Sequence, residues 1–123
     1  MHQGEFVLAK IKHQTWRLRL RSFLMGSNGV REAELTSPRE CALGKWIYSD
    51  ALPKYGTEPE MQQLELNHIR IHELAGKMVR LRKPGLSENP LKDLPDFSEF
   101  QLLSDEIISS LSRLEKTIDS AKP

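Results

Sequence analysis

Two histidines four residues apart are the first sign of chemistry in this sequence. His68 and His72 lie in a run from Met61 to Met78 whose apolar residues recur every three or four positions. Side chains at i and i+4 of a helix point the same way, so both imidazoles could bind one metal ion with bonds of about 2.0–2.1 Å. The pair alone is equally consistent with two core histidines that hydrogen-bond to other groups.

A third histidine and the single cysteine favour the metal. His13 shares a helix face with Trp16, so we expect it to point inward from a different helix, which is hard to explain as packing. Cys41 adds a thiolate. Imidazoles and a thiolate suit Zn²⁺ and lack the oxygen ligands that Mg²⁺ and Ca²⁺ prefer. We therefore predict a tetrahedral zinc site formed by His13, Cys41, His68 and His72.

Catalysis by this site is not expected. The run from His68 to His72 has the paired histidines of a metalloprotease helix, but Ile69 stands where that motif needs a glutamate as general base. Four protein ligands also leave no open position for an activated water. We predict a regulatory protein that is not an enzyme. Two alternatives stay open: a zinc-dependent enzyme with one displaced ligand, and a purely structural helical interaction protein.

A metal-bound Cys41 could act as a redox switch. Zinc holds cysteine as a thiolate, which is the form that a strong two-electron oxidant converts to sulfenic acid or beyond. Oxidised sulfur is a poorer ligand, so the segment that carries Cys41 could move relative to the histidine helices. A conformational signal is the hypothesis that follows.

The elements that must position these residues are helical. Periodicity predicts long helices over about 5–24 and 59–82, and a final long helix over about 97–118. Ser37 and Pro38 resemble an N-cap and first position, which predicts a polar loop to Thr36 and a short helix over about 38–49 that carries Cys41. Prolines within 84–95 predict a connecting loop. We expect an all-α, four-helix-type bundle of three long helices and one short one.

The last helix has a seam whose members are spaced alternately by three and four residues, as in bundles and coiled coils. These residues are Phe97, Phe100, Ser104, Ile107, Leu111, Leu114 and Ile118. The seam leaves apolar surface that a second copy of the chain could cover. We therefore predict a homodimer.

Composition limits the class of protein. The chain has 123 residues and a formal charge of +1, so 1–123 is expected to be one domain without the basic footprint of a nucleic-acid binder. The arginines at 17, 19 and 21 are expected to form a solvated helix face. A single cysteine, the absence of a signal peptide and the absence of 18 consecutive apolar residues predict a cytoplasmic protein that does not enter a membrane.

Three motifs give the sequence a family resemblance. They are His13 with Trp16, the run Cys41-Ala42-Leu43-Gly44-Lys45-Trp46-Ile47-Tyr48, and His68-Ile69-Arg70-Ile71-His72. Together they resemble the bacterial chemoreceptor zinc-binding (CZB) domain over roughly residues 6–80. The resemblance implies a helical homodimer that binds one Zn²⁺ per subunit through the four residues named above. It also implies regulation of a chemoreceptor or a diguanylate cyclase in response to zinc or to oxidants such as hypochlorous acid.

Two positions within these motifs leave questions open. Many members of the family have an acidic residue just before the first histidine, whereas this chain has Lys12, so zinc affinity or cysteine reactivity could differ here. Gly44, three residues after Cys41, could allow close approach of another segment, or could be a simple weakness in helix propensity.

Overall fold

The computed structural model describes residues 3–26, 29–81 and 96–120, and these residues contain helices and no strand. The elements are α1 (Gln3–Leu24), α2 (Glu32–Thr36), α3 (Ala42–Trp46), the π-helical turn η1 (Ile47–Ala51), α4 (Leu52–Tyr55), α5 (Pro59–Leu81) and α6 (Phe97–Ser120). The prediction of an all-α chain with three long helices is confirmed. The predicted loop over 84–95 lies outside the described residues, as do the predicted end of α5 at Arg82 and the histidine at position 2.

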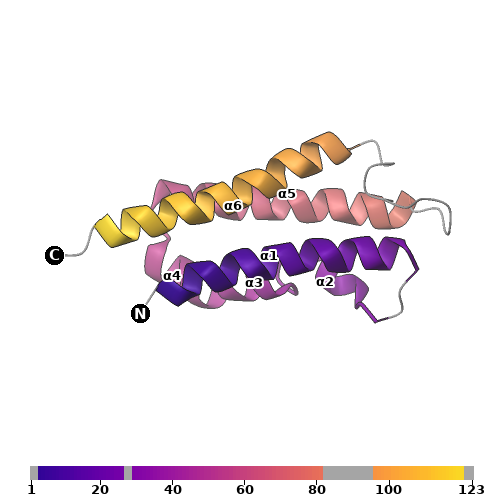
Figure 1. The fold of residues 1–123 in the computed structure, drawn as a ribbon, viewed down its shortest axis with the longest axis horizontal. Coiled ribbons are helices and arrows are strands. Elements are labelled where there is room, and N and C mark those ends of the chain that lie inside the picture. Colours follow the sequence, from indigo (N-terminus) through magenta and orange to yellow (C-terminus); the bar gives the residue numbers. More distant parts are fainter. Residues whose placement is uncertain (1–2, 27–28, 82–95, 121–123) are drawn as a thin grey trace.

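The three long helices run along the longest axis of the molecule (Figure 1). Helices α5 and α6 pack side by side, and α1 packs against α6. The short helices pack beside α1 and α5: α3 contacts α1, and α2 contacts both α1 and α5. The segment between the two histidine-bearing helices therefore bridges them. None of the described helices is long and apolar enough to cross a membrane.

The core follows the apolar stripes of the long helices. Helix α1 buries every third or fourth residue: Phe6, Ala9, His13, Trp16, Leu20 and Leu24. The seam of α6 is buried at Phe100, Ser104, Ile107, Leu111 and Leu114, while Phe97 and Ile118 pack partly against the core. Five of the seven seam residues are buried within the chain, so this seam offers a second copy only its two partly buried ends, and the homodimer stays a prediction.

The segment before α3 differs from its prediction in two ways. Residues 32–36 form α2 where a polar loop was expected, and the next helix begins after Cys41 and not at Pro38. Residues 38–40 form a turn, in which the Glu40 N–H donates to the Ser37 carbonyl. Cys41 has an extended backbone, and its Sγ accepts a hydrogen bond from the Gly44 N–H at 3.1 Å. The cysteine sulfur thus takes the capping role that Ser37 was expected to play.

This helical segment also runs further than the expected end near Ser49. It continues through η1 and α4 to Tyr55. Pro53 has no N–H to donate to the carbonyl four residues earlier, and its ring crowds that carbonyl. A wider π turn just before the proline accommodates both effects, so the chain stays helical beyond the expected end.

Glu5 fastens the start of α1 to the α3–α4 segment. Its carboxylate accepts hydrogen bonds from Trp46 Nε1 and Tyr55 OH, both at 2.9 Å, and lies 3.4 Å from Lys54 Nζ. Burial alone would raise the pKa of Glu5. The hydrogen bonds from Trp46 and Tyr55 and the charge of Lys54 outweigh that effect and lower the pKa.

We expect Glu5→Gln to lower the free energy of unfolding at pH 7 by about 1–3 kcal/mol, because charge-assisted hydrogen bonds are lost. A lowered folded-state pKa means that the carboxylate stabilises the fold above its unfolded pKa of about 4.3, and that this contribution disappears as the pH falls through the folded value. In urea unfolding, the loss of free energy of unfolding caused by Glu5→Gln should therefore be smaller at pH 3 than at pH 7. Glu73→Gln, at a side chain 62% exposed, is the control. Equal costs at both pH values would contradict this account.

Candidate metal centre

Three of the four predicted ligands meet in one place. The Cys41 side chain at the start of α3 faces His68 and His72 on α5, and the possible ligand atoms of all three residues lie within 4.8 Å of one another. Cys41 Sγ is 3.2 Å from His68 Nε2 and 3.3 Å from His72 Nε2. Tetrahedral zinc with bonds of about 2.3 Å to sulfur and 2.0–2.1 Å to nitrogen separates such atoms by about 3.5 Å. The spacing is therefore close to that of a zinc site.

Burial makes these groups neutral in the absence of a metal. The three residues are at most 3% exposed. Burial raises the pKa of the Cys41 thiol to about 11. It lowers the pKa of His68 to about 2, helped by the charges of His72 and His13, and lowers that of His72 to about 4 against the effect of the Leu35 carbonyl. The imidazoles need lose no proton to bind a cation at neutral pH, whereas the thiol must lose one.

A backbone carbonyl selects the tautomer of His72. His72 Nδ1 lies 2.8 Å from the Leu35 carbonyl oxygen of α2. A carbonyl only accepts, so Nδ1–H donates, and the lone pair of Nε2 is directed at Cys41 Sγ. This is the arrangement that orients metal-binding histidines in general. No sequence signal could have identified Leu35, because it acts through its main chain.

The number of hydrogen-bond donors and acceptors around the Cys41 sulfur is consistent with a bound cation. A thiol has one proton, yet two Nε2 atoms lie within 3.3 Å of the sulfur. His68 Nδ1 is buried and has no hydrogen-bond partner among the described residues. If His68 Nε2 carries the proton, its Nδ1 lone pair is left buried and unpaired, and if Nδ1 carries it, the two imidazoles compete for one thiol proton. A cation bound by Cys41 Sγ and both Nε2 atoms removes that competition, so the residues fit a soft or borderline metal ion.

His13 stands beside this group and is not part of it. Its ring is 2% exposed and lies 5.7 Å from the ring of Trp16. Its Nε2 lies 2.8 Å from Ser104 Oγ on α6. Burial lowers the pKa of His13 to about 4, with further lowering from the charges of Arg17 and His72. His13 as the fourth ligand remains a prediction.

Ser104 was part of the predicted α6 seam, but its role was not recognised from the sequence. The available signal was a hydroxyl in an otherwise apolar seam. A buried hydroxyl needs a polar partner, and here His13 supplies it.

Gly44 is needed for the close approach of two segments. A Cβ atom at this position would lie 1.7 Å from the Pro38 carbonyl oxygen and 3.1 Å from His68 Cε1. The first distance is far below any real contact, so only glycine lets the turn at Pro38 lie against α3 and brings Cys41 to α5. The question that the sequence left open is thereby answered in favour of close approach.

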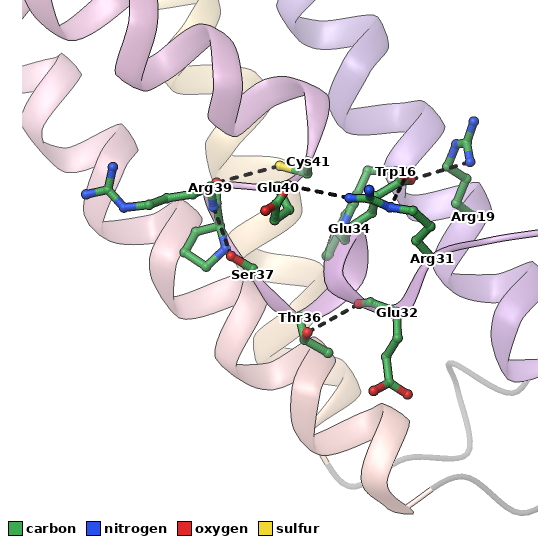
Figure 2. A network of polar contacts seen from close by, with 11 residues as sticks. Trp16, Arg19, Arg31, Glu32, Glu34, Thr36, Ser37, Arg39, Glu40 and Cys41 are labelled. Carbon is green, nitrogen blue, oxygen red and sulfur yellow. Dashed lines mark hydrogen bonds and ion pairs between the residues drawn. The ribbon is translucent and has the colours of Figure 1, made fainter.

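Polar contacts tie α2 to α1, and tie the Cys41 turn to the start of α2 (Figure 2). Trp16 Nε1 donates to the Glu34 carbonyl at 2.9 Å. Arg31 reaches both Glu34, at 3.6 Å, and Glu40, at 3.4 Å. The ion pairs are exposed and individually weak, whereas the Trp16 bond is half-buried and links α1 to α2 next to the metal group.

The fold and the site define an all-helical domain whose buried cysteine and histidines could hold one metal ion. The family model of the chemoreceptor zinc-binding domain (CZB) matches residues 13–79, which is more than half of the chain. The chain therefore belongs to the chemoreceptor zinc-binding domain family. Comparison with curated proteins and with solved structures found no match.

Proposed function

We propose that this chain is a zinc-binding regulatory domain that holds one Zn²⁺ through Cys41, His68 and His72, with His13 as the fourth ligand. The observation that carries the proposal is the buried meeting of one thiol and two imidazoles within 4.8 Å. Membership of the chemoreceptor zinc-binding family supports zinc as the metal. Zinc supplies a cation that keeps Cys41 a thiolate and ties the start of α3 to α5.

The proposed site is closed and has no catalytic turnover. Among the described residues, the group that could hold a metal contains no carboxylate to act as a general base. Its members are at most 3% exposed, which leaves a substrate larger than a few atoms little access. A zinc enzyme would need an open position filled by water.

Metal analysis combined with X-ray absorption spectroscopy tests both the proposed four ligands and the absence of an open position on zinc. We expect about one zinc per chain, surrounded by three nitrogens and one sulfur, and we expect His13→Ala to lose one nitrogen. A protein purified without zinc that also fails to bind added zinc would refute the proposal. Zinc with two nitrogens, one sulfur and a water oxygen in the parent protein would favour the enzyme and reject His13 as a ligand.

The proposed signal is a loosening of the Cys41 segment. The input is zinc itself or an oxidant such as hypochlorous acid, which converts a thiolate to sulfenic acid: RS⁻ + HOCl → RSOH + Cl⁻. The weakened bond to zinc releases the start of α3 from α5. Hydrogen exchange of the zinc-loaded protein before and after one equivalent of hypochlorous acid should show faster exchange around residues 41–46. An unchanged pattern would favour a purely structural role for zinc.

The proposed setting is the cytoplasm, with a chemoreceptor or a diguanylate cyclase as the output protein and no nucleic-acid partner. We also propose a homodimer, now through α1. The outward face of α1 carries exposed, uncharged residues spaced alternately by four and three: Gly4, Leu8, Ile11, Thr15, Leu18 and Ser22. Met25, just past the helix, continues the spacing. This is the spacing of a helix-packing seam. Because α1 also carries a buried stripe, it is apolar on two faces, which favours a partner helix.

Substitution of this outward seam tests the dimer. Leu18→Glu, at a side chain 64% exposed, should yield monomers at micromolar concentrations where the parent sediments as a dimer. A glutamate there would have to be desolvated at the interface. Leu102→Glu on α6, at a residue 70% exposed, is the matched control and should stay dimeric. A parent protein that is monomeric at these concentrations would contradict the proposal.

A further inference from the structure

A buried hydroxyl on α6 makes the polar contact with the fourth predicted ligand. Ser104 is 3% exposed and lies in a seam whose neighbours, Phe100 and Ile107, are fully buried apolar residues. Its Oγ lies 2.8 Å from His13 Nε2 and accepts a hydrogen bond from Arg17 Nη1 at 3.1 Å. Both partners belong to α1. Helix α6 therefore reaches the predicted metal ligand through one side chain.

Arg17 determines how this hydroxyl is used. Its guanidinium donates to Ser104 Oγ and to Gln101 Oε1, the latter at 2.8 Å, and lies 5.4 Å from the centre of the Phe100 ring. A cation that donates to the Ser104 oxygen polarises the hydroxyl, which favours Ser104 as the donor to His13 Nε2.

When Ser104 is the donor, that bond leaves His13 with no nitrogen for a metal. A neutral imidazole has one nitrogen with a lone pair and one that carries a hydrogen. While Ser104 donates to Nε2, the lone pair is occupied and Nδ1 carries the hydrogen. This agrees with the position of His13 outside the group formed by Cys41, His68 and His72.

We infer that Ser104 is a positioning residue that holds His13 away from the metal group in the zinc-free protein, and that zinc takes His13 from Ser104. The inference rests on the proposed function, in which His13 is the fourth ligand. Zinc binding then breaks a contact between α1 and α6. It thereby changes the packing of α6, a helix that contributes no ligand. The contact competes with zinc and lowers the zinc affinity of the chain.

The test compares zinc affinities measured by competition with a chromophoric chelator. Ser104→Ala should bind zinc about 2- to 10-fold more tightly than the parent, the range that one net hydrogen bond contributes. Ser104→Thr keeps the hydroxyl and should bind like the parent. Ser110→Ala, also buried on α6 but bonded to Arg113, should not change the affinity. In the His13→Ala background, Ser104→Ala should produce no gain.

A second measurement reports on the bond itself. Long-range ¹H–¹⁵N spectra of the zinc-free protein should show His13 as the Nδ1–H tautomer with Nε2 accepting, and Ser104→Ala should shift the Nε2 signal. Unchanged or weaker zinc binding by a folded Ser104→Ala variant would overturn the inference. Failure of the parent to bind zinc would instead overturn the proposed function. Weaker binding by His13→Ala without tighter binding by Ser104→Ala would leave the fourth ligand intact and remove only the role of Ser104.

Discussion

Cys41→Ala and His72→Ala should each weaken zinc binding by about 10²- to 10³-fold. Structural zinc sites release roughly 10–16 kcal/mol on binding, and an even division among four ligands assigns about 2.5–4 kcal/mol to each. Every 1.4 kcal/mol is tenfold in affinity. Cys41 and His72 lie at the centre of the group, with Sγ and Nε2 3.3 Å apart, so loss of either removes a bond that no other described group is placed to replace.

Two control variants separate loss of the metal from damage to the fold. Cys41→Ser keeps a side-chain oxygen that can cap α3, where the sulfur now accepts from Gly44, but removes the thiolate. It should fold like the parent and still lose zinc. His2→Ala, at a histidine with no assigned role, should keep the zinc affinity of the parent. Zinc content near one per chain in all four variants would show that the metal lies elsewhere.

Gly44→Ala should weaken zinc binding as severely as loss of a ligand, although Gly44 itself contributes no ligand atom. Its added methyl group would lie 1.7 Å from the Pro38 carbonyl oxygen, so the backbone of the turn must move. The turn carries Cys41, and the same methyl would lie 3.1 Å from His68 Cε1. Overpacking of this kind costs about 1–3 kcal/mol in flexible surroundings, and the cost should reach or exceed the upper figure here because the obstacle is backbone.

Gly76→Ala is the matched control for that substitution. Gly76 lies on α5 one turn after His72, and a Cβ there would have its nearest neighbour, Arg80, at 3.5 Å, which is an ordinary contact. Alanine is also the better helix former, so this variant should be as stable as the parent or more stable. Urea unfolding and chelator competition on both variants decide the matter. Equal behaviour of the two would mean that the turn at Pro38 does not place Cys41.

Local patterns were sufficient to predict the long helices and most of the metal group. The stripes of α1, α5 and α6 have helical periodicity because each helix buries one face, and that periodicity is visible in any single sequence. His68 and His72 share a helix at i and i+4, so their common direction follows from helix geometry alone. Cys41 could be assigned to the same site because its chemistry suits the same metal and because the run from Cys41 to Tyr48 resembles the family whose model matches residues 13–79.

The tertiary structure decided what depends on contacts between segments distant in the chain. The cap on α3 is sulfur and not Ser37, because the Pro38 turn lies against Gly44 in a way that no propensity describes. The tautomer of His72 depends on a main-chain carbonyl of α2, and the polar contact of His13 is a hydroxyl 91 residues away. Such contacts leave only weak traces in sequence, since a carbonyl belongs to every residue and a serine in an apolar seam does not identify its partner. Residue type and spacing therefore determined which atoms could bind a metal, and packing between helices determined which of them meet.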